Sequence, residues 1–394
     1  MKNSNLYYIA SARLPTEKAN GHQIVKMCNA FSKVFDRVEL IIPFRLKHGP
    51  TKEIKDIYSF YGIEKNFGIK IMNSPDFLPL FREVKFSSAE SLFFILQERI
   101  FAKKAVSHVK EKESGIVFTR SRRVLRKLVT EEAHLKHKII YECHRLTKRE
   151  AVVLSEISSK INLIVALTEA LKEDLLEAGI AGGKILVCPD GVDLKQFEKA
   201  SKDDIDLGFE KATAGKFIAG YAGSFYNWKG ITTFIQAVKY LKNNICVVLA
   251  GSSQKEFREI KKIAGVADNV NLKYIGYLPP KNIPCFIKKC NVMVVPNTAT
   301  DKIFSRHSSP LKLFESMACG VLVIGSNLPC VSEIIRDKEN GLLFEPDNPH
   351  ALAEKIEYAE KHPEMVEKIS LNAKKTILNY TWEKRVEKII TRLN

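Results

Sequence analysis

Short apolar runs alternate with amphipathic stretches along the first half of the chain, and each pattern predicts one kind of element. The apolar runs predict β-strands at 6–10, 38–42, 116–118, 138–142, 163–167 and 185–187. Helical periodicity lies between them, at 23–34, 88–110 and 169–178. Strands that alternate with helices indicate right-handed βαβ units, and continuously apolar strands such as 163–167 indicate a parallel sheet covered on both faces.

The alternation stops at 189–216, a polar stretch with no strong period, and then starts again. The second series of strands is predicted at 217–222, 246–250, 270–275, 292–295, 321–324 and 342–344. We therefore predict an α/β fold of two doubly wound, Rossmann-like domains at 1–200 and 201–375, with a C-terminal helix at about 376–394 that packs back on the first. Ligands of such sheets bind at the carboxyl ends of strands, so the expected site is the cleft between the domains.

Composition narrows the class of protein but not its partner. The chain has 394 residues, enough for two or three domains of about 150 residues each. Its net charge of +17 attracts polyanions such as nucleic acid, an anionic membrane or a phosphorylated ligand. No apolar run reaches the roughly 18–20 residues of a membrane span, and the start of the chain is unlike a signal peptide. The eight cysteines lack zinc spacing, so we expect them to be reduced and buried in a cytoplasmic protein.

The segment 307–324 carries the most chemical information. Ser309 is expected to cap a helix whose first residue is Pro310, and Gly320 suits its carboxyl end. The free N–H groups at the start of this helix form an anion site. Glu315 lies between apolar residues, where its carboxylate can accept hydrogen bonds from the two hydroxyls of a ribose. An ordinary amphipathic helix with a solvated glutamate explains the pattern equally well, and both interpretations stay open.

A second segment, 220–230, follows an apolar strand and precedes a helix. Its small residues allow the backbone to approach a ligand closely, and Lys229 would then place a compact positive charge beside a diphosphate. The alternative is a glycine turn with a surface lysine. The segment 187–197 contains an Asp-Gly turn whose simplest interpretation is structural.

The order of these segments resembles the retaining glycosyltransferases of family 4, the group 1 transferases with the GT-B fold of two Rossmann-like domains facing a cleft. The similar segments run from about residue 6 to residue 382, and they are Gly21, 141–144, 187–197, 223–230, 271–278 and 309–324. Each is modest alone, but together and in this order they are specific. The resemblance implies a nucleoside-diphosphate sugar as the donor, with no metal and no other cofactor.

The resemblance also implies roles for individual residues. Lys229, Glu315 and His144 are placed in the catalytic centre: Lys229 at the diphosphate, Glu315 at the ribose and His144 facing the donor sugar. Tyr277 is assigned to the nucleotide base. The remaining donor-binding residues are Gly21, in the loop that closes over the diphosphate, and Gly223, Ser224, His307, Ser309, Pro310, Leu311 and Lys312.

Two positions depart from the family pattern. His307 stands where the first glutamate of the Glu-x7-Glu motif is usual, and Ser224 stands where an arginine commonly follows the glycine. A histidine can donate to a sugar hydroxyl but carries no negative charge. The loss of the arginine removes one charge from the diphosphate site. Activity is still expected, and the identity of the donor sugar stays undecided.

The predicted function is a retaining transfer of a sugar to a hydroxyl acceptor, in the biosynthesis of a cell-surface glycan or glycolipid. Expected partners are the nucleotide-sugar donor and a glycan or lipid-linked acceptor, at the inner face of the cytoplasmic membrane. The dense basic stretch 120–127 fits contact with anionic lipid, but it fits a solvated helix face equally well. A GT-B sugar-nucleotide epimerase is the alternative function. Nucleic-acid binding is a distant third, because no recognisable RNA-binding or zinc-finger signature is present.

Overall fold

The computed structural model describes residues 4–46, 51–77, 88–267 and 271–393, and it divides the chain into two compact units. Unit 1 comprises Met1–Leu167, Leu171–Cys188 and Arg385–Asn394, and unit 2 comprises Thr168–Ala170 and Pro189–Lys384. The prediction drew the boundaries at residues 200 and 376. The segment after Pro189 belongs to unit 2 because the N–H of Val192 donates to the Tyr380 carbonyl at 2.9 Å.

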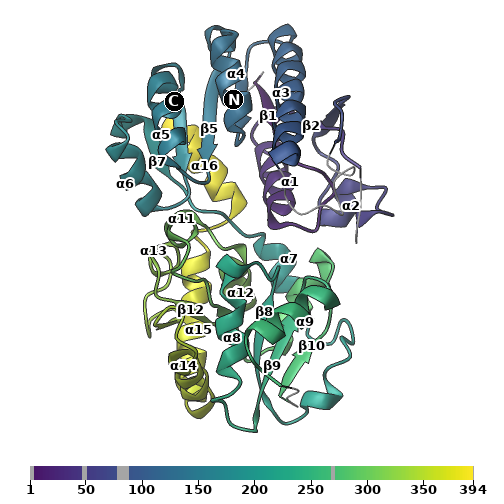
Figure 1. The fold of residues 1–394 in the computed structure, drawn as a ribbon, viewed down its shortest axis with the longest axis vertical. Helices are drawn as coiled ribbons and strands as arrows, with labels where there is room; N and C mark the ends of the chain where they lie inside the picture. The colour runs from purple at the N-terminus through teal and green to yellow at the C-terminus, as the bar shows by residue number, and fades with distance from the viewer. Residues whose placement is uncertain (1–3, 47–50, 78–87, 268–270, 394) are drawn as a thin grey trace. The chain divides into compact units, whose positions relative to one another are not determined.

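Unit 1 is built on a seven-stranded sheet in the order β3-β2-β1-β4-β5-β6-β7, and every described strand pair is parallel (Figure 1). The strands are β1 (Asn5–Ile9), β2 (Arg37–Pro43), β3 (Gly68–Met72), β4 (Ile116–Thr119), β5 (Lys138–Cys143), β6 (Leu163–Ala166) and β7 (Ile185–Val187). The central strands are buried along their whole length, as the continuous apolar runs predict.

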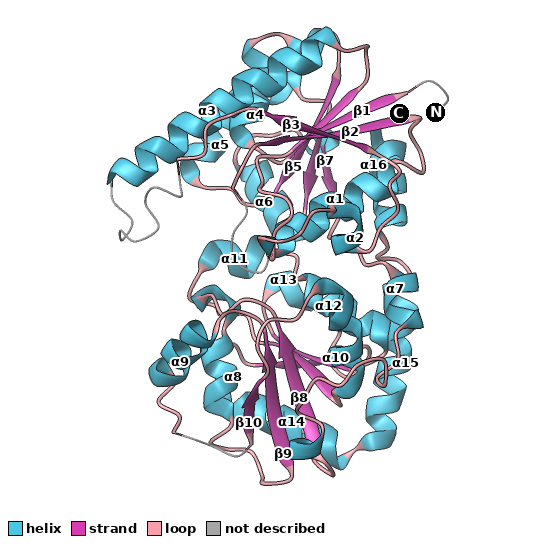
Figure 2. Cartoon of the chain, turned by 90° about the vertical axis from the view of Figure 1, so that its right-hand side faces the viewer, coloured by secondary structure: helices cyan, strands magenta, loops and turns pink. Residues whose placement is uncertain are grey.

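Helices cover both faces of this sheet (Figure 2). They are α1 (Ala19–Phe31), α2 (Ile57–Tyr61), α3 (Ser88–Glu111), α4 (Arg122–Thr130), α5 (Lys148–Ile157), α6 (Glu169–Glu177) and the unit 1 part of α16 (Trp382–Leu393). Residues of α3, α4, α5 and α6 share one apolar core with the sheet, which includes Phe101, Leu125, Leu154 and Leu171. The connection from β3 through α3 to β4 reverses the strand order between β1 and β4.

Unit 2 is built on a six-stranded parallel sheet in the order β10-β9-β8-β11-β12-β13. Its strands are β8 (Phe217–Ala222), β9 (Ile245–Ala250), β10 (Leu272–Tyr274), β11 (Val292–Val295), β12 (Leu322–Ser326) and β13 (Leu342–Phe344). Each predicted strand of both units overlaps a strand of the structure, although the start of 270–275 lies outside the described residues. The edge strand β3 was not predicted.

The helices of unit 2 also form two layers. They are α7 (Leu194–Lys199), α8 (Ile231–Ala237), α9 (Gln254–Ile263), α10 (Ile283–Lys289), α11 (Lys302–His307), α12 (Leu311–Cys319), α13 (Pro329–Ser332), α14 (Pro349–Lys361) and α15 (Pro363–Ile377). Successive residues of β9 point to opposite cores: Cys246 and Val248 pack with α10 and α12, whereas Val247 and Leu249 pack with α8 and α14. Both faces of the sheet are therefore covered, which confirms the predicted doubly wound α/β class.

Candidate active site

The candidate site lies where the strand order of unit 2 reverses, between β8 and β11. In sheets of this kind the connections after these two strands pass to opposite faces, and ligands bind at the carboxyl ends between them. Lys229 lies in a short 3-10 turn after β8, and α12 follows β11 and α11 in the chain. The two most informative sequence segments therefore border one switch point.

Close backbone contacts hold the loops of this edge together, and glycine makes them possible. Gly230 has φ 66°, and a Cβ there would lie 1.7 Å from the Pro296 carbonyl oxygen, at the end of β11. Gly251, after β9, has φ 114°, and its Cβ would lie 2.1 Å from the carbonyl oxygen of Gly223. A side chain at either position would push apart the loops that carry the site.

Two lysines come together at this edge. Lys312, in the first turn of α12, is 8% exposed, and its Nζ has no hydrogen-bond partner among the described residues. Burial and the charge of Lys229 lower the pKa of Lys312 well below its ordinary value, against the opposing effect of Glu315. Burial likewise lowers the pKa of Lys229 to about 8. Two such amines without a carboxylate ion pair in the described structure are typical of an anion site.

Aromatic rings position both amines. The Nζ of Lys312 lies 3.5 Å from the ring centroid of Tyr221, whose hydroxyl donates to the Ser224 carbonyl at 2.7 Å. The Nζ of Lys229 lies 3.8 Å from the ring centroid of Trp228. Trp228 in turn stacks on Phe304 of α11, with centroids 4.2 Å apart. Both cations thus rest against rings, which stabilise a positive charge without neutralising it.

The start of α12 differs from the prediction. The helix begins at Leu311 with Pro310 at the N-cap position, and Ser309 does not cap it. The Ser309 hydroxyl instead accepts from the N–H of Asp190 at 2.9 Å, which joins the Asp-Gly turn of 187–197 to this loop. The cap fails because this distant donor takes the serine oxygen. The first N–H groups of the helix still have no partner within the helix itself.

The other predicted residues of unit 2 lie around the same edge. His307 is the last residue of α11 and is buried, whereas Glu315 is half-buried, one turn beyond Lys312. Gly223 and Ser224 follow β8 directly. Tyr277 comes after β10, next to Gly276, whose carbonyl accepts from the N–H of Gly251 at 2.7 Å. The structure therefore brings the predicted donor residues of unit 2 to one edge of its sheet.

Gly21 and His144 belong to unit 1, and the structure gives each a local explanation. Gly21 lies in the first turn of α1 rather than in a loop, and a Cβ there would meet Thr16 and Tyr61 at 2.4 Å. His144 contacts the Glu142 carboxylate through Nε2, and its Nδ1 lies 3.2 Å from Nη2 of Arg120. A carboxylate only accepts and a guanidinium only donates, so this geometry fits a neutral ring with the proton on Nε2.

The electrostatics of unit 1 support that assignment. Burial and Arg120 lower the pKa of His144 to about 4, against the opposing effect of Glu142. Burial acts to raise the pKa of Glu142, but Arg385, His144 and Arg120 together bring it well below its ordinary value. The neutral His144 has both nitrogens engaged within the unit, an arrangement suited to a structural role.

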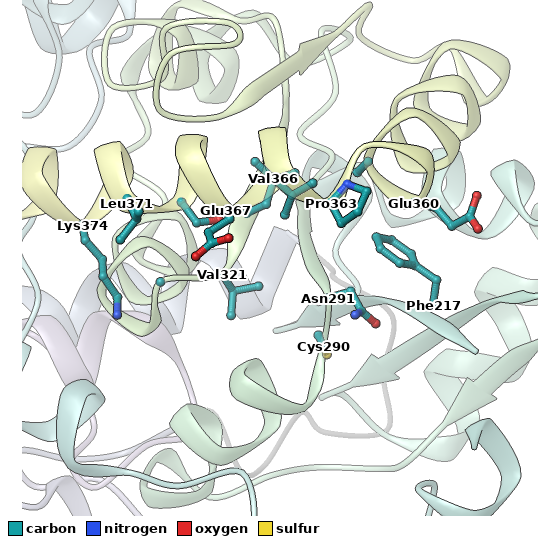
Figure 3. Close-up of a pocket in the computed structure, with 14 residues that line it drawn as sticks. Phe217, Cys290, Asn291, Val321, Glu360, Pro363, Val366, Glu367, Leu371 and Lys374 are labelled. Atoms are coloured by element: carbon teal, nitrogen blue, oxygen red, sulfur yellow. The ribbon is translucent and has the colours of Figure 1, made fainter. Parts of the chain in front are cut away.

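A cavity of about 410 Å³ lies at the opposite edge of unit 2 (Figure 3). Its lining includes Phe217 at the start of β8, Asn291 just before β11, and Val366 and Lys374 of α15. This is the amino-terminal edge of the sheet, where ligands of open parallel sheets do not usually bind. The lysine pair is therefore a better candidate site than this cavity.

Comparisons with known proteins bear on the family and the fold of the chain. The family model "Glycosyl transferases group 1" matches residues 204–376. An uncharacterized glycosyltransferase of Methanocaldococcus jannaschii is 23% identical over 89% of this chain and 86% of its own. The capsular polysaccharide biosynthesis glycosyltransferase CapM of Staphylococcus aureus is 26% identical over 55% of this chain and 57% of its own. These matches support a glycosyltransferase of the group 1 superfamily.

The solved structures confirm the GT-B fold class. HepE of Anabaena, solved in complex with UDP and glucose, has a TM-score of 0.75 and 16% identity over 99% of both chains. Sucrose-phosphate synthase of Thermosynechococcus elongatus has a TM-score of 0.76 and 15% identity over 98% of both chains. Within the described residues, no helix combines the length and the apolarity that a membrane crossing requires.

Proposed function

We propose that this protein is a retaining glycosyltransferase that transfers a sugar from a nucleoside-diphosphate sugar to an acceptor hydroxyl. The observation that carries the proposal is the lysine pair at the switch point of unit 2, where Lys312 is buried and has no hydrogen-bond partner within the described part of the chain. A diphosphate supplies the negative charge that this pair needs. In HepE, a protein of similar fold, the bound ligands are UDP and glucose, which is consistent with such a donor.

The residues of the site have distinct roles in this reaction. Lys229 and Lys312 bind the diphosphate, and the N–H groups of Leu311 and Lys312 at the start of α12 face the same charge. When the bond from the sugar to the phosphate breaks, negative charge grows on the leaving oxygen, where these groups stabilise it. The carboxylate of Glu315 accepts hydrogen bonds from the ribose hydroxyls. Lys312 also supplies a second positive charge beside Ser224, where the family arginine is absent.

The acceptor hydroxyl attacks from the face that the diphosphate leaves, so the anomeric configuration is retained. The leaving phosphate takes the acceptor proton, and the products are the glycoside and a nucleoside diphosphate. This route needs neither a metal ion nor a second carboxylate. The name of CapM motivates the further proposal that the product belongs to a cell-surface glycan or glycolipid. A cytoplasmic location, where nucleotide sugars are made, fits the proposal.

A panel of nucleoside-diphosphate sugars tests the proposal directly. The true donor is expected to raise the melting temperature in proportion to the logarithm of its concentration, and to release nucleoside diphosphate when an acceptor is added. Lys229→Ala should lower turnover by about 10²–10³-fold without unfolding the protein, the usual loss for one donor group at a developing anion. Chelation of metal ions should leave turnover unchanged.

Lys242→Ala is the matched control, because Lys242 is an exposed lysine of the same unit that precedes β9. This variant should retain wild-type turnover. Wild-type turnover in Lys229→Ala, with the best donor of the panel, would contradict the site assignment. Release of an epimerised free sugar without any acceptor would instead identify a sugar-nucleotide epimerase.

A further inference from the structure

A groove in unit 1 gathers positive charge from three helices. Its volume is about 740 Å³, and α3, α4 and α5, with the loop before α5, supply its lining. The basic residues that line it are Arg99, Lys103, Arg122, Arg123, Arg126, Lys127, Arg145 and Arg149. Among the described residues that line the groove, Glu150 alone is acidic. Every residue that lines the groove belongs to unit 1.

The carboxylates of the described residues neutralise only a few of these cations. Glu150 is shared between Arg122 and Arg145, and Lys127 pairs with Glu131 at 2.7 Å. No ion pair with a described residue is formed by the remaining five: Arg99, Lys103, Arg123, Arg126 and Arg149. These unpaired cations give the groove a strong positive potential, and they also repel one another.

Arg123 shows how tightly the charges are packed. Its guanidinium is half-buried and lies 5.7 Å from the ring centroid of Phe94 on α3. Burial lowers the pKa of Arg123, and the neighbouring charges of Arg122 and Arg99 lower it further, against the opposing effect of Glu98. An anion bound in the groove would relieve this repulsion, whereas a neutral ligand would not.

The side chains that line the groove favour phosphate groups among possible anions. Arginine presents parallel N–H groups that match the oxygens of a phosphate group, and six of the lining cations are arginines. The groove also includes the first turn of α5, whose dipole adds positive potential. Phe94 and Leu96 are 40% and 44% exposed on α3, so an apolar surface lies near the cations. A phosphate ester attached to an apolar group fits both features.

We propose that this groove binds the phosphate or diphosphate group of a phosphorylated acceptor, as a second anion site of the enzyme. The acceptor role rests on the proposed glycosyltransferase function, but the binding of phosphate by the groove does not. The groove would hold the acceptor by its phosphate group, and the lysine pair of unit 2 would hold the donor by its diphosphate. The two sites use separate residues in separate units, so each can be removed without the other.

Binding of radiolabelled pyrophosphate in equilibrium dialysis tests the groove on the full chain. The groove variant is Arg126→Ala/Arg149→Ala, which removes two exposed arginines from different helices. Its matched control is Lys138→Ala/Lys160→Ala, which removes two exposed lysines of unit 1, at the start of β5 and just beyond α5. The donor-site variant is Lys229→Ala/Lys312→Ala. Circular dichroism checks that each variant is folded.

The wild type and the control variant should bind two pyrophosphates. The groove variant should lose one of them, through an affinity at least about tenfold weaker, as expected for lost charge-assisted hydrogen bonds. Two unaltered pyrophosphates in the groove variant, or an equal loss in the control, would overturn the proposal. If the donor-site variant binds as much pyrophosphate as the wild type while the groove variant binds less, the proposed function fails and the groove proposal stands.

Co-sedimentation with vesicles then identifies the source of the phosphate. The same variants are mixed with phosphatidylcholine vesicles, with and without phosphatidylglycerol. Pelleting that needs phosphatidylglycerol and is lost in the groove variant assigns the groove to a lipid phosphate at a membrane surface. Pyrophosphate binding without such pelleting assigns it to a phosphate group presented in solution. If the groove variant matches its control with both probes, the groove is not a phosphate site.

Discussion

Each unit buries a charged side chain near the carboxyl ends of its strands. The two side chains differ in their hydrogen-bond and ion-pair partners. Glu142 of unit 1 is fully buried and accepts from Gln23 at 2.6 Å and from Arg385 at 3.3 Å, in addition to its contact with His144. Lys312 of unit 2 is almost as deeply buried, yet its Nζ has no hydrogen-bond partner in the described residues. The nearby charge of Lys229 acts against its protonation.

This contrast distinguishes a buried charge that stabilises the fold from one that is suited to binding a ligand. A buried charge with a full set of partners is stabilised within the fold, and Arg385 also donates to the Cys188 carbonyl at 3.1 Å, so it joins α16 to the end of β7. A buried amine without partners opposes folding, because the fold must either bury its charge or remove its proton. A ligand that supplies the missing negative charge removes this cost. The predictions below test this difference, from the largest expected effect to the smallest.

Removing Arg385 should destabilise the protein most. Arg385→Met leaves Glu142 buried opposite an apolar side chain, and breaking a buried ion pair in this way lowers the free energy of unfolding by about 3–5 kcal/mol. Urea denaturation measures the change. Lys384→Met is the control, because Lys384 is the exposed neighbour of Arg385 and should change stability by less than about 0.5 kcal/mol. Equal stability in the two variants would show that the pair has no structural role.

Removing Lys312 should have the opposite effect on stability. Lys312→Met keeps the length of the side chain and removes the unpaired charge, so the free energy of unfolding should rise by about 1–3 kcal/mol. Donor affinity should fall about tenfold or more in the same variant, because one cation of the diphosphate site is lost. Thermal melts with and without donor measure both quantities. A variant that is less stable than the wild type would mean that Lys312 is a structural lysine.

The fold was predictable from sequence because parallel strands covered on both faces leave long apolar runs. The exception, β3, is an edge strand that pairs only with β2 in the described sheet, and its residues are exposed or half-buried. A strand that is not covered on both faces does not need a continuous apolar run, so its sequence signal is weak. The strand therefore depends on pairing with a distant segment, which the sequence pattern does not reveal.

Candidate site residues could be identified from the sequence only where they lie in segments that resemble a known family. Lys229, Lys312 and Glu315 lie in segments whose order resembles a known family, and their neighbourhood is visible from local pattern. Arg385 is 243 positions from Glu142, and no local signal links the two. The basic stretch 120–127 was recognised, but the structure divides it. Arg120 contacts Gln23 and His144, whereas the groove is lined by Arg122, Arg123, Arg126 and Lys127.

The lysine pair also predicts how donor binding depends on pH. A bound diphosphate favours the charged amine, and the pKa of Lys229 in the free protein is about 8. As the pH rises above 8, the free protein loses the proton that binding requires, so donor affinity should fall by up to about tenfold per pH unit. Titration calorimetry from pH 7 to 10 measures the trend. Lys229→Arg, which stays charged over this range, should show a shallower fall, and a wild-type affinity independent of pH would contradict the assignment.

His144 tests the paired side of the comparison through the pH dependence of stability. Its folded-state pKa of about 4 lies below the ordinary value of 6.5, so between these values the unfolded chain takes up a proton that the folded protein does not. Stability should therefore be complete above pH 6.5 and fall with acid toward pH 4, by up to about 1.4 kcal/mol per pH unit. His144→Gln should flatten this slope in urea denaturation, whereas His350→Gln, at an exposed position, should not. An unchanged slope in His144→Gln would mean that folding does not lower the pKa of the ring, and the neutral structural role would then be wrong.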